Sequence, residues 1–335
     1  MDEHLLEVKN LKVSFKIGKK KLTAVDDVTF SLDRGKVIGI VGESGCGKSV
    51  TATSIMRLGS PSVCEIDENS QILFEGEDLS KASEARMRKV RGNEISMIFQ
   101  EPMSSLNPVY RIGDQMLEMI RTHHREIPKK EALKQCIEML ARVGIPSPEQ
   151  RIREFPHQMS GGMRQRVMIA MALLCQPKLL IADEPTTALD VTIQAQILRI
   201  LKKLAEESDT SVILITHDMG VVAEMADHVM VMYAGKSVEY GTAEDIFDHP
   251  MHPYTVGLLK SIPKLGSGQE DHLFTIEGTV PGLDEMPAGC RFSTRCPYAT
   301  EQCKKEDPGM QGEAGHFVRC FRFMDPEIQD SREVE

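Results

Sequence analysis

The chain has 335 residues, of which 41% are hydrophobic and 27% are charged, as in ordinary folded globular proteins. This length allows one large domain with an appendage, or two modest domains. The net charge of -10 and the lack of a block of Lys and Arg exclude a general nucleic-acid binder, because such proteins neutralise phosphates with clustered cations.

The sequence shows no targeting or membrane-spanning segment. Its first residues, MDEHLLEVKN, lack the basic start and apolar run of a secretory signal. No stretch approaches the roughly 18 to 20 consecutive apolar residues that cross a bilayer. We therefore expect the chain not to enter a membrane by itself.

The first elements in chain order are strands. Residues 5–15 and 22–32 alternate apolar and polar positions, which predicts antiparallel strands with one face in water. The unbroken apolar run VIGIV at 37–41 predicts a buried strand, which leads through a glycine loop into a helical pattern.

The middle of the chain predicts helices and then a parallel sheet. Within 101–160 the apolar residues fall at helical spacing, as expected of a helical subdomain insert. Apolar runs at 179–182, 212–216 and 229–233 alternate with helical patterns, which is typical of βαβ units. Beyond about 235 the pattern weakens into Gly, Pro and His turns. The fold class is therefore α/β, with an antiparallel β subdomain, a helical insert and a C-terminal appendage.

A glycine loop between strand and helix carries the phosphate-binding pattern G-x-x-x-x-G-K-[ST]. Glycines allow successive N–H groups to face phosphate oxygens, and the helix N-terminus adds positive potential. We expect Lys48 to hold the β and γ phosphates and Ser49 to bind Mg²⁺; a structural glycine turn is the alternative. The other predicted contacts are Gly42, Ser44, Gly45, Cys46, Gly47 and Val50.

Two carboxylates end the apolar strand in LLIADEP at 179–185. Ligands of open α/β sheets bind at this end of the strands. We expect Asp183 to hold Mg²⁺ and Glu184 to polarise an attacking water molecule. An acidic pair can also cap a helix, but the upstream phosphate loop favours the catalytic interpretation.

Ser160, Gly161 and Gly162 precede an apolar helical pattern, where they form an N-cap with exposed backbone donors. Taken alone, this pattern predicts only the start of a helix. In MSGGMRQR, shortly before the acidic strand end, it resembles the signature of ABC-type ATPases, although Met159 and Met163 stand where Leu and Gln are usual.

The resemblance implies ATP and Mg²⁺ as cofactors and assigns further residues. Gln100 in SMIFQEP resembles the Q-loop glutamine, Asp190 in ALD the D-loop, and His217 in VILITHD the switch histidine. Phe15 resembles the aromatic residue that stacks on adenine, but an isolated Phe is as often a core residue. The implied Mg²⁺ ligands are Ser49, Gln100 and Asp183; the implied catalytic residues are Lys48, Glu184 and His217.

The family pattern also implies a dimer. In ABC proteins the nucleotide lies between the phosphate loop of one cassette and the signature turn of another, and this chain has one cassette. We therefore expect head-to-tail pairing with a second ABC ATPase subunit, with a related chain preferred over a second copy. Water would then attack the γ-phosphate in line.

The segments FPHQMSGGMRQRVMIAMALL, EPMSSLNPVYRIGDQ and HPMHPYTVGLL resemble ATP-binding subunits of bacterial dipeptide and oligopeptide importers. This implies an ATPase cassette at 1–260, with 101–160 receiving a permease, and an appendage at 261–335. It also implies two transmembrane permease subunits, an extracytoplasmic solute-binding protein, and a peripheral position on the cytoplasmic face of the membrane. Importers of another solute such as nickel, and ABC ATPases not tied to transport, are the alternatives.

Cys290, Cys296, Cys303 and Cys320 crowd the C-terminal part of the chain, while the other four cysteines are scattered. This asymmetry fits a local metal site better than a disulfide framework. Thiolates select zinc or iron–sulfur, and the spacings match neither the common zinc pairs nor the ferredoxin patterns. CRFSTRCP resembles the tail of the peptide-importer ATPases, which implies a 4Fe-4S cluster with a structural role. Zinc, or four free thiols, remain the alternatives.

Overall fold

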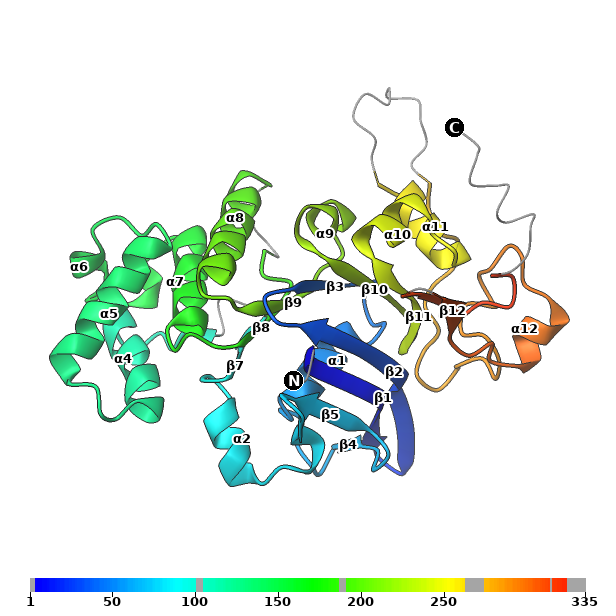
Figure 1. Ribbon diagram of the computed structural model, residues 1–335, viewed down its shortest axis with the longest axis horizontal. Helices are drawn as coiled ribbons and strands as arrows, with labels where there is room; N and C mark the ends of the chain where they lie inside the picture. Colours follow the sequence, from blue (N-terminus) through cyan, green and yellow to red (C-terminus); the bar gives the residue numbers. More distant parts are fainter. Residues whose placement is uncertain (1–3, 101–104, 187–190, 263–273, 314, 324–335) are drawn as a thin grey trace. The chain divides into compact units, whose positions relative to one another are not determined.

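The computed structural model describes residues 4–100, 105–186, 191–262, 274–313 and 315–323 (Figure 1). The chain divides into two compact units. The first comprises residues 1–32, 37–80 and 216–335, and the second comprises 33–36 and 81–215. Each unit is an α/β structure with its own strands and helices. Among the described residues, no helix combines the length and the apolar character needed to cross a membrane.

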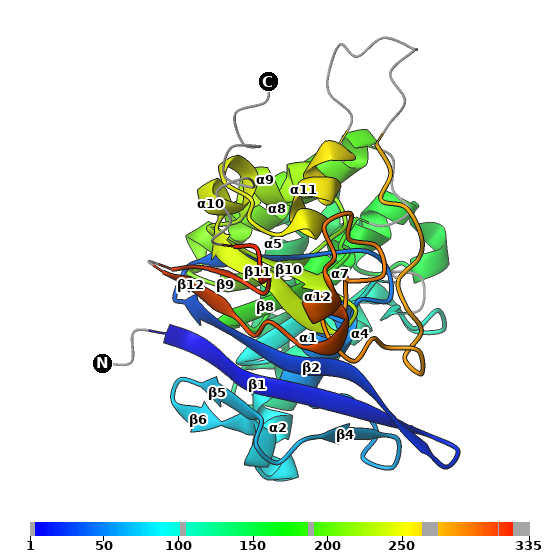
Figure 2. The same cartoon turned by 90° about the vertical axis from the view of Figure 1, so that its right-hand side faces the viewer.

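The first unit contains an antiparallel sheet built on two strands of 14 residues each. Its neighbours run in the order β2-β1-β5-β6, and β4 pairs with a further part of β1. Figure 2 shows β1 and β2 as the long blue pair. The alternation read from the sequence is confirmed here. The bounds are β1 (His4–Ile17), β2 (Lys20–Asp33), β4 (Cys64–Ile66), β5 (Gln71–Phe74) and β6 (Glu77–Asp78).

A second group of strands in the first unit runs in the order β12-β13-β11-β10-β3. β10 is parallel to β3, whereas the β10–β11 and β11–β13 pairs are antiparallel. The strands are β3 (Val37–Val41), β10 (His228–Tyr233), β11 (Lys236–Thr242), β12 (Gln311–Glu313) and β13 (His316–Val318). The helices are α1 (Lys48–Ile55), α9 (Met219–Met225), α10 (Ala243–Asp248), α11 (Pro253–Lys260) and α12 (Glu301–Lys305).

The second unit holds three parallel strands in the order β9-β8-β7, and every residue in them is buried. They are β7 (Ile95–Ile98), β8 (Leu179–Asp183) and β9 (Ser211–Ile215). The helical elements are α2 (Glu84–Val90), α4 (Ile112–His123), α5 (Lys129–Arg142), α6 (Pro148–Arg151), η2 (Pro156–Gln158), α7 (Gly161–Leu173) and α8 (Val191–Glu207), and η1 (Leu79–Lys81) lies at the boundary of the two units.

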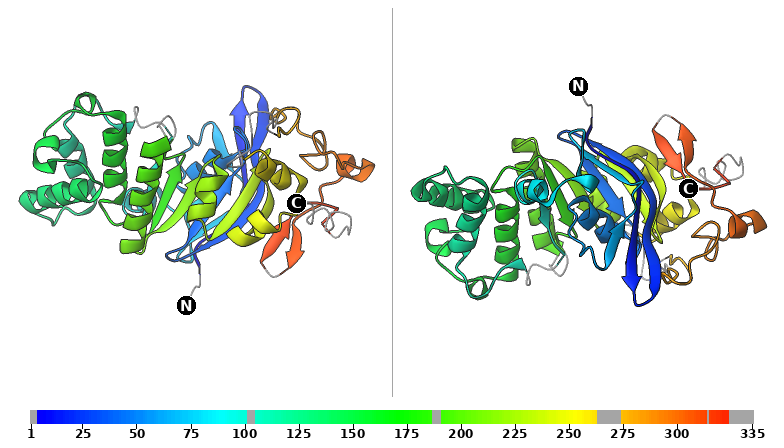
Figure 3. Two further views of the ribbon diagram at one scale, coloured as in Figure 1. Left: turned by 90° about the horizontal axis from the view of Figure 1, so that it is seen from above. Right: turned by 90° about the horizontal axis from the view of Figure 1, so that it is seen from below.

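The predicted insert at 101–160 is helical, with α4, α5 and α6 in it, and α4 and α5 pack together and against α7, which follows the insert (Figure 3). On α4 the side chains of Ile112, Met116 and Ile120 are buried at a spacing of four residues, so they form one apolar stripe. On α5 the thiol of Cys136 is buried, and its burial raises the pKa to about 12. This cysteine therefore packs as a small apolar residue.

The C-terminal segment continues the first unit, because β13 pairs with β11. The HPMHPY motif explains part of this attachment. The buried carboxylate of Glu239 accepts hydrogen bonds from the backbone N–H groups of Met251 and His252, at 2.7 and 2.9 Å, and lies 2.9 Å from Nε2 of His316. The boundary at residue 260 between cassette and appendage stays a prediction.

Candidate functional site

The glycine loop at 42–49 connects β3 to α1 as expected. Gly42, Gly45 and Gly47 have φ values of 145°, 80° and 103°, a region that L side chains rarely adopt. A Cβ atom on Gly42 would also lie 2.2 Å from the carbonyl oxygen of Met232. The motif therefore requires glycine at this position for two separate reasons.

Lys48 is 6% exposed and lies inside the loop. Its Nζ donates hydrogen bonds to the carbonyl oxygens of Gly42, at 2.7 Å, and Glu43, at 3.0 Å. Ser49 is exposed on the first turn of α1, as a ligand must be. Cys46 is buried, and burial raises the pKa of its thiol, so it fills the turn and has no reactive character.

Two further predicted residues of the site, Phe15 and His217, belong to the first unit but not to the phosphate loop. Phe15 is half-buried on β1, paired in register with Cys64 of β4. His217 is exposed and lies two residues after the end of β9, while Asp218 caps α9 through the N–H groups of Gly220 and Val221. The cap fixes the backbone next to His217.

Glu184 carries the clearest functional geometry in the second unit. Its φ of 46° lies in the left-handed region, which a glutamate rarely adopts and which clusters at active sites. Its N–H donates to the carbonyl oxygen of Ile215 at 2.9 Å, and its Oε2 accepts a hydrogen bond from Nε2 of Gln100 at 3.0 Å. The carboxylate of Asp183 is 4% exposed at the end of β8. The structure therefore brings Gln100 to Glu184, next in sequence to Asp183, at the carboxyl ends of β7 and β8.

The signature turn forms the N-terminus of α7. The Oγ of Ser160 accepts a hydrogen bond from the N–H of Met163 at 3.3 Å, and Gly161 is exposed. Gly162 is half-buried, and a Cβ there would lie 3.2 Å from Ile193. The predicted cap is therefore present on a helix of 13 residues.

The structural role of Gln165 was not predicted from the sequence, where this residue is only part of the signature motif. Its side chain is buried, and its Nε2 donates to the carbonyl oxygen of Pro185, the residue after Glu184. A hydrogen bond therefore links the signature helix α7 to the segment that carries Glu184. Among the predicted residues, Asp190 lies outside the described part of the chain.

Cys290, Cys296, Cys303 and Cys320 line one small cavity in the first unit. Burial raises the pKa of Cys290, Cys296 and Cys320 to about 11, and neighbouring cysteines contribute to each increase. Among the described residues, however, no three Cys, His, Asp or Glu side chains are arranged to hold one metal ion. The four cysteines thus share one cavity, and the metal site stays a prediction.

Comparison with known proteins defines the class to which this site belongs. Residues 25–187 match the family described as ABC transporter. Residues 238–303 match the family described as oligopeptide/dipeptide transporter, C-terminal region. The chain belongs to the ATP-binding proteins of the ABC transporter family. It is an ATP-binding protein whose ATP hydrolysis is coupled to transport.

Its relatives extend the similarity over nearly the whole chain. The oligopeptide transport ATP-binding protein AppD of Bacillus subtilis is 51% identical, over 98% of this chain and 99% of AppD. The oligopeptide transport ATP-binding protein OppD of Haemophilus influenzae is 53% identical, over 90% of this chain and 91% of OppD. The dipeptide transport ATP-binding protein DppD of Bacillus subtilis is 51% identical, over 98% of this chain and 96% of DppD.

Among solved structures, the dimeric cassette MJ0796 bound to ADP and Pi in a post-hydrolysis state is similar. It is 26% identical, with a TM-score of 0.63, over 71% of this chain and 98% of MJ0796. These findings confirm the resemblance read from the sequence motifs.

Proposed function

We propose that this chain is the ATP-hydrolysing subunit of an importer for dipeptides or oligopeptides. The left-handed Glu184, hydrogen-bonded to Gln100 at the strand ends, is the observation that carries the catalytic part. The substrate class rests on the relatives, which are oligopeptide and dipeptide transport proteins matching the chain at about its full length.

The proposed roles follow from the chemistry of each side chain. Lys48 supplies a positive charge to the β and γ phosphates, and the loop N–H groups bind their oxygens. Glu184 orients the attacking water, and His217 contacts the γ-phosphate. The buried carboxylate of Asp183 is a hard oxygen donor that suits Mg²⁺, with Ser49 and Gln100 as the other ligands. Phe15 would stack on adenine.

The proposed active form is a head-to-tail pair of ABC ATPase subunits. The turn formed by Ser160, Gly161 and Gly162 begins a helix with unpaired N–H groups, which suits the phosphates of a nucleotide held by another subunit. Asp190 keeps its proposed role as the D-loop residue of the nucleotide site. The description of the similar cassette MJ0796 as a dimer supports this assembly. A related chain, rather than a second copy, stays our preferred partner.

Exposed apolar side chains in the second unit support the proposed permease contact. Phe99 is 44% exposed, Val109 is 72% exposed and Tyr110 is 56% exposed, and they flank the segment that follows Gln100. Exposed large apolar side chains that fall in one short stretch of the chain are candidates for a contact with another protein. We infer that this surface binds a transmembrane permease pair, which places the subunit at the cytoplasmic face of the membrane, with an extracytoplasmic binding protein delivering the peptide.

Native co-purification from the host membrane tests this function. We expect the chain to recover two permease subunits and a second ABC ATPase, and cells that lack the chain to lose uptake of labelled peptides. Replacing both Val109 and Tyr110 with Ser should remove the permease from the purified complex while the ATPase activity of the free subunit stays unchanged. Ile17→Ser is the matched control, because Ile17 is a similarly exposed apolar residue in the first unit. Normal peptide uptake without the chain would contradict the proposal.

We also propose that the four C-terminal cysteines hold a 4Fe-4S cluster with a structural role. No carboxylate is among the described residues that line their cavity, so the donors are soft, as iron–sulfur clusters and zinc require. The segment CRFSTRCP, which resembles the tail of the peptide-importer ATPases, favours the cluster over zinc. Because burial raises the pKa values of Cys290, Cys296 and Cys320 to about 11, a positively charged group is needed to hold these three as thiolates.

The metal content of Cys296→Ser tests the cysteine site. After anaerobic purification we expect about four iron atoms per parent chain. The variant should lose most of this iron, and its unfolding midpoint should fall by roughly 5 °C or more, since a bound metal contributes folding free energy. Cys64→Ser, which changes a half-buried cysteine outside the cavity, should keep its iron. One zinc ion per parent chain in place of iron would refute the iron–sulfur cluster. A parent chain without metal would refute both the cluster and the zinc alternative.

A further inference from the structure

An arginine of the C-terminal segment contacts the phosphate loop directly. The side chain of Arg295 is 3% exposed, and its guanidinium forms two hydrogen bonds to the Glu43 carboxylate. Nη1 donates to Oε2 at 2.6 Å and Nη2 donates to Oε1 at 3.1 Å. This two-point pairing is the strong and directional form of an Arg–carboxylate contact. Glu43 is the second residue of the loop, so the contact is made inside the motif.

The guanidinium is fixed by further contacts. Its Nε donates to the carbonyl oxygen of Glu277 at 2.8 Å, and Nη2 donates to that of Ile276 at 3.0 Å. The hydroxyl of Tyr233 lies 3.3 Å from Nη1, and the guanidinium carbon lies 5.7 Å from the centre of that ring. Arg295 therefore presents a rigid pair of donors to Glu43, which a flexible lysine would not do.

Glu43 in turn connects Arg295 to the phosphate-binding lysine. The backbone N–H of Glu43 donates to the hydroxyl of Tyr254, on α11, at 2.8 Å. Its carbonyl oxygen accepts a hydrogen bond from Nζ of Lys48 at 3.0 Å. Through its side chain and its backbone, Glu43 thus connects the C-terminal segment to the centre of the phosphate loop.

We propose that Arg295 is a positioning residue for nucleotide binding, which acts through Glu43. It holds the first turn of the phosphate loop in its binding conformation, and it neutralises a carboxylate that would otherwise repel the phosphates. The segment with Cys290 and Cys296 is thereby part of the nucleotide-binding machinery. This inference rests on the proposed ATP-binding function of the loop.

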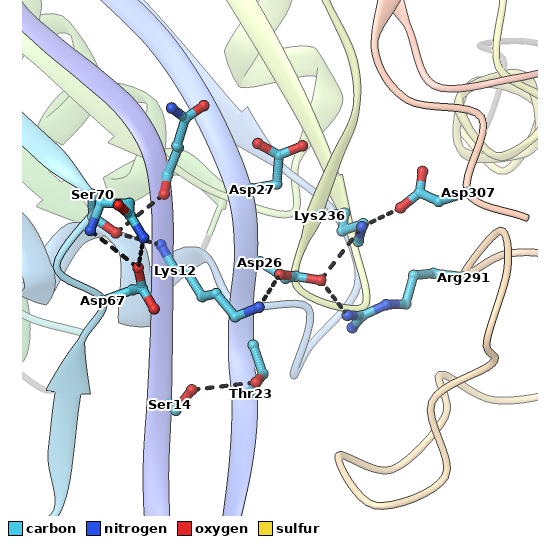
Figure 4. A network of polar contacts seen from close by, with 12 residues as sticks. Lys12, Ser14, Thr23, Asp26, Asp27, Asp67, Ser70, Lys236, Arg291 and Asp307 are labelled. Atoms are coloured by element: carbon cyan, nitrogen blue, oxygen red, sulfur yellow. Dashed lines mark hydrogen bonds and ion pairs between the residues drawn. The ribbon is translucent and has the colours of Figure 1, made fainter.

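A neighbouring arginine supplies a matched control. Arg291 belongs to the same segment, but it donates to Oδ2 of Asp26 at 2.8 Å and to the carbonyl oxygen of Ala234 at 2.7 Å, two acceptors outside the loop. Figure 4 shows Arg291 and Lys236 converging on Asp26. Removing Arg291 loosens the attachment of the segment and leaves the Arg295–Glu43 pair in place.

The test is the equilibrium affinity of the full chain for ATP and Mg²⁺, with the thermal midpoint measured in parallel. We expect Arg295→Ala to weaken ATP binding roughly tenfold. Arg295→Lys should lie between parent and Ala, because lysine keeps the charge without the two-point geometry. Adding Glu43→Gln to Arg295→Ala should restore part of the affinity, since the unpaired carboxylate is removed. Arg291→Ala should bind ATP within about twofold of the parent, even if its midpoint falls.

Two results would overturn the proposal: parental ATP affinity in both Arg295 variants, or equal weakening by Arg291→Ala, which would indicate only a general loss of the segment. A gain of affinity on adding Glu43→Gln is a readout that a merely structural role does not produce. If the parent fails to bind ATP, the proposed function itself fails and the role of Arg295 falls with it.

Discussion

Glu184→Gln is expected to lower ATP turnover by roughly 10²- to 10⁴-fold, the range that a positioned general base contributes. Gln has the shape of Glu and retains an oxygen that accepts the hydrogen bond from Gln100, so the resting geometry at the ends of β7 and β8 should persist. Only the ability to polarise the attacking water is lost. ATP should therefore still bind, and the ATP-bound pair of subunits should accumulate.

Phosphate release at saturating ATP measures the turnover, and size-exclusion chromatography with ATP detects the trapped pair. Glu207→Gln is the control, because this carboxylate is in the same unit but pairs with Arg142 on the surface, at 2.7 Å. Turnover at the parental rate in Glu184→Gln would remove Glu184 from the proposed mechanism.

Lys48→Met should lower ATP hydrolysis by roughly 10²- to 10³-fold, the usual loss when one donor to a developing negative charge is removed. Methionine keeps an apolar stem in a position that is 6% exposed, so the α1 packing is retained. The change removes the ammonium group that bonds the carbonyl oxygens of Gly42 and Glu43. In contrast to Glu184→Gln, this variant should also bind ATP weakly.

Titration with ATP and the same phosphate-release assay separate the two variants. Lys21→Met, which removes an exposed lysine paired with Glu65, should leave both quantities unchanged. Tight ATP binding by Lys48→Met would show that the loop backbone alone holds the phosphates, and would contradict the role given to this side chain.

The local part of the site was predictable from sequence because short motifs encode local backbone geometry. The glycines of the phosphate loop predict the positive φ values that Gly42, Gly45 and Gly47 adopt. The apolar spacing of four residues predicted the helices of the insert, and Ser160 predicted the cap of α7. In each case the signal lies within a few residues of the feature that it specifies.

The contacts that position the site over long sequence distances were not predictable. Glu43 and Arg295 are 252 residues apart, and neither residue type at its position indicates the other. The hydrogen bond from Gln165 to Pro185 depends on the tertiary packing of α7, which contacts β7 and α8 and which no local pattern specifies. The left-handed backbone of Glu184 likewise arises from tertiary contacts, since an isolated glutamate avoids it.

The pairing of distant segments also sets the order in which the two units acquire structure during synthesis. Residues 81–215 contain nearly all of the second unit, whereas β1 and β2 of the first unit share that unit with residues from 216 onward. Arg319 contacts Asp27 at 2.8 Å across 292 positions of the chain. Such distant contacts slow folding, because the entropy of closing a long loop must be overcome first. Strand β3 is therefore synthesised long before β10, the strand with which it pairs, and in that interval its unpaired edge needs protection from aggregation.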